Sequence, residues 1–350
     1  MSGVANKGMQ RLPQPRGPIS ELLLEALPSE RSALEPVDPP VPTDPLSDED
    51  LQLSLYLCYE LHYRGLPGVD DRWEWEPSVL GLRAALERQF EQALLAAVPL
   101  ADEGVAAAEI DRALRDVAEQ EGPELSGYVQ RKATLEQVHE FVIHRSAYQL
   151  KEADPHSWAI PRLTGAPKAA LIEIQADEYG GGRPEWIHAD LFARSMRALG
   201  LDPAYGAYLE LIPGVTLATV NQMSLFGLHR RLSGAIVGHL ALFEMTSSIP
   251  NRRYGDGLRR LGLGGDATLF FNEHVEADAV HESVAAVDLA GGLVRQDPSW
   301  AAQVLWGART LVYLSDRWAT HLLSCWREGR SSLLRERQPE PLELSGAVAP

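Results

Sequence analysis

Helical patterning runs through most of this chain, and strand-like alternation of apolar and polar residues is nearly absent. Apolar residues that recur at offsets of three and four, bounded by Ser, Gly or Pro, are typical of amphipathic helices. Such segments lie at about 77–98, 105–120, 125–150, 166–179, 184–199, 203–211, 214–231, 233–247, 255–261, 266–292, 298–315 and 316–328. Successive helices with short connections bury their apolar faces against one another. The sequence therefore predicts an all-α, layered helical bundle.

The first 47 residues differ from the rest because they are rich in proline, as in PVDPPVPTDPLSDED. One short helical patch, ISELLLEAL, interrupts what we expect to be a largely extended arm at 1–47. From Asp48 the pattern turns helical, with Ser47 suited to the N-cap and Gly65 to the stop. We expect a helical region packing on the core at 48–124, the core itself at 125–335, and a frayed tail at 336–350.

The bulk properties limit the classes of partner. The 350 residues are 45% hydrophobic, which suffices for a sizeable core, and carry a formal net charge of −17. That charge disfavours nucleic acid and anionic membrane surfaces. Cys58 and Cys325 form no CxxC pair, which favours a reducing compartment, and the N-terminus has no signal-peptide pattern. We expect a soluble, cytoplasmic protein.

One segment, FFNEHVEADAVHE, places His274, Asp278 and His281 at offsets of four and three. On a helix these offsets return all three side chains to one face. The flanking residues Phe270, Phe271, Val275 and Ala277 are apolar, so the polar stripe lies near the core. Burial of such groups is costly unless they are paired or bind a metal. The stripe favours a metal site, with a hydrogen-bonded His–Asp cluster as the alternative.

A second group of chemically active residues lies in DEYGGGRPEWIHADLF. Pro184 suits the first position of a helix, and Glu185 and His188 then form an E-x-x-H pair in its first turn. Such a pair presents a carboxylate and an imidazole to a dinuclear metal centre in helical bundles. Glu178 precedes three glycines that break the helical path, so it can fold back toward the same point.

A different set of metal ligands is also possible. Glu136 and His139 form a second E-x-x-H pair, which could combine with Glu185 and His188 as in ferritin-like proteins. This alternative ranks second because it leaves the stripe at 274–281 unexplained. Glu152 lies at a helix end before Pro155. On the segment GAIVGHLALFEMTSS, we expect the glycines to serve helix packing, and His239 and Glu244 to be satisfied core or rim groups.

Taken together, these residues resemble the haem-oxygenase-like di-iron oxidases and oxygenases, also called iron-containing redox enzymes. The family pattern is a glutamate on one core helix, an E-x-x-H on the next, often with a further glutamate upstream, and H-x-x-x-D-x-x-H on a third. The resemblance covers roughly 125–335 and implies a haem-oxygenase-like bundle with additional N-terminal helices. The metal ligands that it implies are Glu152, Glu178, Glu185, His188, His274, Asp278 and His281.

The resemblance also implies a function. Two iron ions, without haem, react with O2 and oxidise a small amine- or carboxylate-bearing substrate, with an electron donor as a further partner. N-oxygenation is the favoured reaction, and desaturation or oxidative C–C cleavage is the alternative. A metal-free haem-oxygenase-like protein and a non-enzymatic helical binding protein also remain possible, as does a homodimer.

Five cations of the core could pair with a substrate carboxylate: Arg145, Arg162, Lys168, Arg230 and Arg231.

Overall fold

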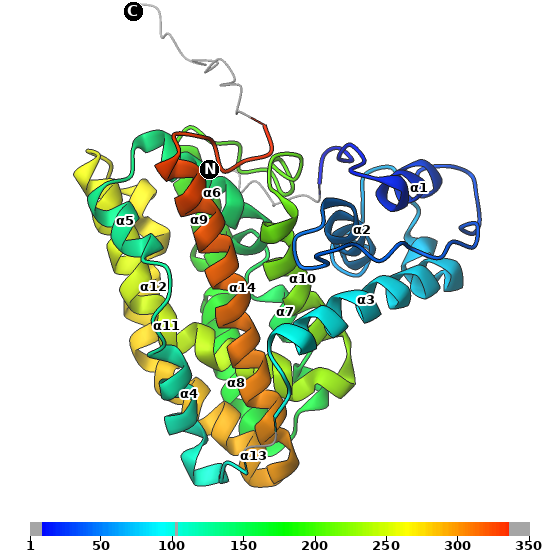
Figure 1. Ribbon diagram of the computed structural model, residues 1–350. Coiled ribbons are helices and arrows are strands. Elements are labelled where there is room, and N and C mark those ends of the chain that lie inside the picture. Colours follow the sequence, from blue (N-terminus) through cyan, green and yellow to red (C-terminus); the bar gives the residue numbers. More distant parts are fainter. Residues whose placement is uncertain (1–8, 102–103, 336–350) are drawn as a thin grey trace, which may run out of the picture.

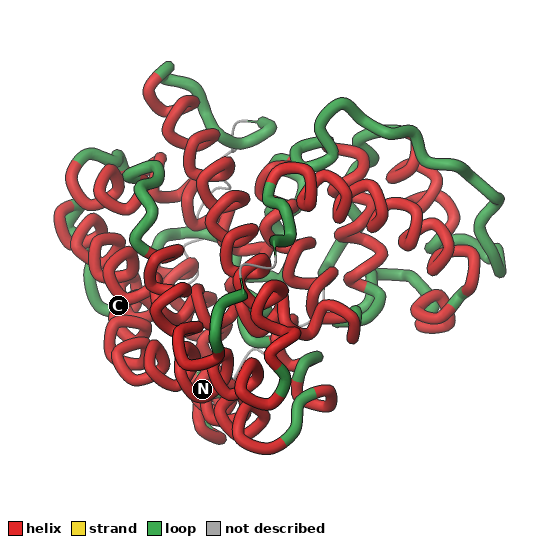
Figure 2. Tube along the Cα trace, turned by 60° about the horizontal axis from the view of Figure 1, so that its bottom comes forward, coloured by secondary structure: helices red, strands yellow, loops and turns green. Residues whose placement is uncertain are grey.

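The computed structural model describes residues 9–101 and 104–335, except for the side chains of residues 276–280. Its α-helices are α1 (Pro18–Ala26), α2 (Glu49–Glu60), α3 (Pro77–Ala97), α4 (Ile110–Ala118), α5 (Leu125–Arg131), α6 (Leu135–Gln149), α7 (Asp154–Ser157), α8 (Gly165–Glu178), α9 (His188–Ala198), α10 (Gly214–Leu228), α11 (Ser233–Arg260), α12 (Asp266–Ser283), α13 (Gly291–Gln296) and α14 (Ala301–Arg327). Helices and loops make up all of the described chain, with no strand (Figure 2). The prediction of an all-α helical bundle is confirmed.

The long helices form the main bundle, and the first three form a flank beside it (Figure 1). At the centre, α11 packs on both α14 and α12, and α12 in turn packs on α9. On the flank, α2 packs on α1 and α3 and attaches them to the bundle through α10. This arrangement brings α8, α9, α11 and α12 together around the candidate site.

Several helix boundaries differ from the sequence prediction for local reasons. The predicted helix at 125–150 is two helices, because Thr134 caps α6 in a reciprocal capping box with Gln137. The segment 203–211 forms turns instead of a helix. Conversely, α11 continues from Ser233 to Arg260 through Pro250, where two shorter helices were predicted. Buried residues on both sides of Pro250 hold the helix together despite the lost backbone hydrogen bond.

The C-terminal part of the predicted helix at 266–292 also departs from regular geometry. α12 ends at Ser283 and leads into a π-helical stretch, Val284–Ala290, before α13 begins. π-helical turns are rare and occur frequently at functional sites.

α11 is the central helix of the bundle. Within the described residues, the segment Arg230–Arg260 is long and apolar enough to cross a membrane by length and composition, but 67% of its most apolar window is buried inside the protein. A core helix passes the same test. Gly238 on α11 faces α14 so closely that a Cβ atom there would overlap the carbonyl oxygen of Val304. The packing role predicted for the glycines of this helix is therefore confirmed at Gly238.

We expect Gly238→Ala to destabilise the protein by about 1–3 kcal/mol, since a new methyl group must push α11 away from α14. Urea unfolding measured by circular dichroism tests this prediction. Gly81→Ala is the matched control, because Gly81 is an exposed glycine in α3 with open space around its Cα. There the same substitution should stabilise by about 0.5–1 kcal/mol. Equal effects at the two positions would contradict the packing role.

His144 on α6 is a buried histidine that makes stability depend on pH. It contacts Thr216 Oγ1 at 2.7 Å and Ser332 Oγ at 3.1 Å, and burial, with a smaller effect of His321, lowers its pKa from 6.5 to about 3. Between pH 6.5 and 3 the unfolded chain therefore binds a proton that the folded chain does not, so stability falls as the pH falls. We expect His144→Gln to flatten the slope of unfolding free energy between pH 6 and 4 by about 1.4 kcal/mol per pH unit. An unchanged slope would contradict this.

Candidate metal centre

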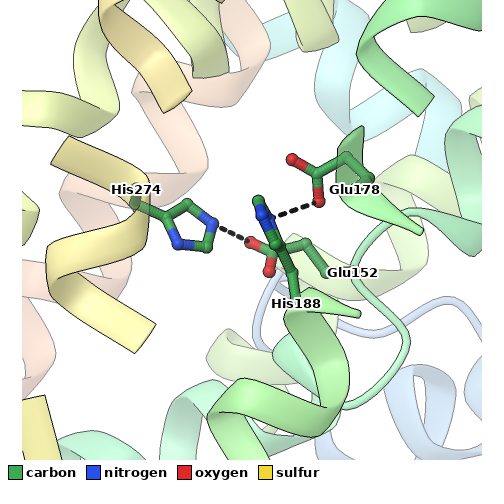
Figure 3. Close-up of side chains that lie close together, drawn as sticks. All are labelled: Glu152, Glu178, His188 and His274. Atoms are coloured by element: carbon green, nitrogen blue, oxygen red, sulfur yellow. Dashed lines mark ion pairs between the residues drawn. The ribbon is translucent and has the colours of Figure 1, made fainter. Parts of the chain in front are cut away.

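Four buried side chains from four segments converge inside the bundle (Figure 3). They are Glu152, Glu178, His188 and His274, and each offers one ligand atom within 4.8 Å of those of the others. Glu152 lies in the turn after α6, Glu178 ends α8, His188 begins α9, and His274 lies in the middle of α12. We call this set the first group.

A second group shares one residue with the first. Glu178, Glu244 and His281 are all buried and place their ligand atoms within 4.8 Å of one another. Glu244 comes from α11, and its Oε2 lies 3.3 Å from Nδ1 of His281. Glu178 therefore belongs to both sets of nitrogen and oxygen donors.

The glycines between α8 and α9 explain how Glu178 and His188 meet. Gly180, Gly181 and Gly182 all have positive φ, between 58° and 82°, which other residues rarely adopt. A Cβ on Gly180 would also approach the backbone of Trp186 and Ile187 to 2.8 Å. The chain therefore reverses tightly, and Glu178 Oε2 lies 3.0 Å from His188 Nδ1.

The imidazoles on α12 are oriented by partners on their outer sides. His274 Nδ1 lies 2.9 Å from the carbonyl oxygen of Phe270, and its Nε2 lies 3.5 Å from Glu152 Oε1. His281 Nε2 lies 3.0 Å from Asp177 Oδ2, which leaves Nδ1 facing Glu244. A histidine that donates one ring N–H to an oxygen presents the lone pair of its other nitrogen inward, as metal ligands do.

The electrostatics of the two groups are strongly coupled. Burial alone would raise the pKa of Glu178, but the nearby imidazole of His188, followed by His274 and His281, lowers it to about 2. Burial likewise opposes the charge on His281, yet Glu244, Asp177 and Glu178 raise its pKa to about 9. The buried Glu178 carboxylate is therefore charged and needs nearby positive charge, which either protonated histidines or metal ions can supply.

The donor atoms fit a metal better than they fit one another. Glu178 Oε2, His188 Nδ1 and His281 Nδ1 are buried and lack an aligned hydrogen bond, although oppositely charged atoms lie within about 3 Å of them. Buried polar atoms are otherwise almost always hydrogen-bonded. These donor atoms lie close together without forming aligned hydrogen bonds, as expected of ligands that point at a common metal ion. A donor set of imidazole and carboxylate suits iron or manganese.

Glu185 is not brought to either group. The predicted helix from Pro184 is wrong at its start, because Pro184–Trp186 forms a short 3-10 turn and α9 begins only at His188. Ile187 between them has an extended ψ of 125°, so Glu185 and His188 do not share a helix face. Glu185 is exposed, and the carboxylate beside His188 is that of Glu178.

Of the other expected ligands, Asp278 lies on α12, but its side chain falls outside the described residues. The competing motif is placed elsewhere: Glu136 is exposed, and with His139 it lines a cavity near Trp326 and Arg330, away from both groups. The ferritin-like pairing of the two E-x-x-H motifs therefore has no support in the positions of these residues.

Two residues of this centre were missed by sequence reasoning. Glu244 was expected to be a satisfied core or rim group, and Asp177 was not considered as a partner of His281. The available signal for Glu244 was its position as a lone acid in the apolar run AIVGHLALFEM. No periodic motif links it to the α12 histidines, because Glu244 and His281 lie on different helices and meet only when α11 packs against α12.

A small cavity adjoins the first group. Its volume is about 10 Å³, the space of roughly one water molecule. Its wall includes Tyr148, Glu152, His156, Gln175, Glu178, Leu240, Phe243, Glu244, Ser247 and His274. Phe243 and Ser247 are only half-buried, so they form the side of the cavity nearest to solvent.

Helical bundles that enclose buried carboxylates and imidazoles are a known architecture of metal-binding proteins, and this chain has that architecture. The sequence model of the iron-containing redox enzyme family matches residues 139–316, about half of the chain, and this range holds all members of both groups. The chain belongs to the iron-containing redox enzyme family. The resemblance seen in the sequence is confirmed.

The chain is also similar to nitrosourea synthase of Streptomyces achromogenes subsp. streptozoticus. The two are 27% identical over 146 residues, which are 41% of this chain and 31% of that protein. The chain therefore spans under a third of the length of that relative. Together with the family, this similarity supports an oxidoreductase that uses iron.

Proposed function

We propose that the protein is a non-haem di-iron oxygenase that transfers oxygen from O2 to the nitrogen of a small amine. The observation that carries the proposal is the shared carboxylate: Glu178 belongs to two buried donor groups at once. The similarity to nitrosourea synthase supports N-oxygenation over desaturation or C–C cleavage, because a nitrosourea contains a nitrogen–oxygen bond. Desaturation and C–C cleavage remain the alternative reactions.

In this proposal Glu152, His188 and His274 would hold one iron, Glu244 and His281 would hold the other, and Glu178 would contribute to both. Asp278 is retained as a further ligand on the ground of the family pattern alone. The bound ferrous ions supply the electrons that reduce O2, which the side chains present here cannot supply. Haem is not part of the proposal, because a set of carboxylates and imidazoles from several segments exceeds the axial ligands of a haem and suits separate metal ions.

The protein residues orient the ligands and limit access of water. Gln149 is buried, and its amide satisfies both neighbours when its nitrogen donates to Glu152 Oε1 at 2.6 Å. Asp177 similarly fixes the ring of His281 from the outer side. Phe243 and Tyr148 line the cavity beside Glu152 and narrow it to about 10 Å³. The proposed partners are O2, an amine substrate and a separate electron donor in the cytoplasm.

A metal-free function receives less support. A hydrolase with a cysteine nucleophile needs a reactive thiolate, but burial raises the pKa of Cys58 to about 12, and Cys325 is buried as well. Neither thiol belongs to either donor group. No feature of the described residues favours a purely non-enzymatic binding role.

The test is oxygenation by the iron-loaded protein. Protein reconstituted anaerobically with ferrous iron is exposed to ¹⁸O-labelled O2 with a reductant and a panel of primary amines and amino acids. We expect O2 uptake and a product that gains labelled oxygen on nitrogen, identified by mass spectrometry. Oxygen uptake with a desaturated or cleaved product would select an alternative reaction, and no uptake with any substrate would refute oxygenase activity.

A further inference from the structure

Arg145 is an unusual cation close to the donor groups. It lies on α6 and is half-buried. Its Cζ stands 5.7 Å from the ring centroid of Tyr148, 5.9 Å from that of Phe243 and 5.7 Å from that of Trp318. Three aromatic rings thus surround a guanidinium that has lost part of its water.

This guanidinium lacks an acidic partner. Several other half-buried arginines meet a carboxylate: Arg16 lies 2.7 Å from Glu49, Arg64 lies 3.6 Å from Asp154, and Arg317 contacts Asp44. Arg162, which is also half-buried, instead donates to the backbone carbonyls of Gly227 and Leu228. Among the residues that the structure describes, no carboxylate oxygen lies within 4 Å of a guanidinium nitrogen of Arg145. A partly desolvated charge without a counterion is costly, and aromatic rings compensate only part of that cost.

Arg145 is nevertheless connected to the first group. With the Gln149 amide oriented to satisfy both ends, its oxygen accepts from Arg145 Nη2 at 3.0 Å while its nitrogen donates to Glu152 Oε1 at 2.6 Å. Tyr148 and Phe243, which hold the guanidinium, also line the cavity beside Glu152. The cation therefore lies against the wall of the cavity, on its half-exposed Phe243 side.

The charges around the cavity indicate what Arg145 can bind. Metal ions in the two groups would balance Glu152, Glu178 and Glu244, which leaves the guanidinium as an uncompensated positive charge at the cavity wall. Its planar fork of donors matches a carboxylate in two parallel hydrogen bonds. Phe243 is half-buried, so its displacement would open a path between Arg145 and the metal donors.

We propose that Arg145 binds the carboxylate of the substrate at the mouth of the cavity, so that the substrate is an amino acid whose amine faces the metal centre. This inference rests on the proposed oxygenase function and adds a substrate class to it. The competing role is that of a positioning residue, in which Arg145 serves only to hold Gln149 against Glu152.

The experiment compares amino acids with the amines that remain when the carboxylate is removed. The anaerobic, iron-loaded protein is titrated with L-lysine and cadaverine, L-ornithine and putrescine, L-arginine and agmatine, and L-tyrosine and tyramine. Binding is followed by thermal shift and by changes in the ferrous spectrum. We expect at least one amino acid to bind about ten- to a hundredfold more tightly than its amine, as for the loss of a charged hydrogen-bonded pair.

Variants separate the two roles of Arg145. Arg145→Gln should abolish the preference for the amino acid while the iron content stays that of the wild type, and Arg145→Lys should restore part of it. Gln149→Ala should weaken iron binding and leave the preference in the protein that still holds iron. Arg253→Gln is the matched control, because Arg253 is half-buried but pairs with Glu124.

The inference is overturned if no amino acid binds better than its amine, or if Arg145→Gln keeps the wild-type preference. It is also overturned if Arg145→Gln and Gln149→Ala lose iron to the same extent, which would assign Arg145 a positioning role. These outcomes differ from failure of the proposed function, which would appear as absence of iron in the wild-type protein.

Discussion

Replacement of Glu178 by alanine is expected to remove iron from both positions of the centre and leave the folded protein with iron close to background. Glu178 is the one residue that the two donor groups share. In the proposed centre its loss would remove a ligand from each position, and it would leave His188 Nδ1 without the carboxylate that lies 3.0 Å away. Anaerobic reconstitution followed by iron analysis on the desalted protein measures the effect.

Glu244 provides a graded comparison for this prediction. Because Glu244 belongs only to the second group, Glu244→Ala should lower the iron content to about half of that of the wild type. Equal loss in the two variants would argue against Glu178 as a bridge and for a single metal position.

Glu185→Ala and Glu136→Ala are the matched controls. Both residues are exposed glutamates in E-x-x-H motifs, and neither belongs to a donor group. We expect both variants to keep the iron content of the wild type. Loss of iron in Glu185→Ala would restore the sequence-based expectation for that residue, and loss in Glu136→Ala would restore the ferritin-like pairing.

Lys151→Ala is expected to destabilise the protein by about 3–5 kcal/mol, because it leaves a buried carboxylate without its cation. Lys151 contacts Glu60, and the side chains are only 1% and 0% exposed. The ammonium lies 4.3 Å from the ring centroid of Tyr63, and the Tyr205 hydroxyl contacts both oxygens of Glu60 at 2.7 and 2.8 Å. This pair joins the N-terminal flank to the turn that holds Glu152.

Chemical denaturation of the metal-free protein measures this effect, and Lys132→Ala is the control at an exposed lysine, where a change within about 0.5 kcal/mol is expected. The double variant Lys151→Met with Glu60→Leu should cost less than the sum of the single variants, since both charges are removed together. An additive result would mean that the two side chains do not stabilise each other.

The fold was predictable because helix periodicity is local. The glycine contact of α11 and the absence of strands in the described chain follow from spacing that can be read within about one or two turns. The caps of α2 were less exact, because Asp48 and not Ser47 caps its N-terminus and the helix ends at Glu60, before Gly65. Helix continuity was less predictable, since burial on both sides carries α11 through Pro250 against its local preference.

The candidate centre was predictable only where its residues lie in motifs. His188, His274 and His281 are recognisable from their neighbours in the sequence. By contrast, Glu185 and Glu178 compete for the place beside His188, and the outcome depends on the positive φ angles of three glycines. Glu244 reaches His281 through the packing of α11 on α12, a contact that no spacing in the sequence specifies.

The central claim, that two iron ions share Glu178, is tested most directly by anaerobic titration with ferrous iron followed by Mössbauer spectroscopy of the ⁵⁷Fe-loaded protein. We expect saturation near two irons per chain and, after brief exposure to O2, ferric ions that are magnetically coupled to each other. Saturation at one iron per chain, or two irons without magnetic coupling, would contradict the claim.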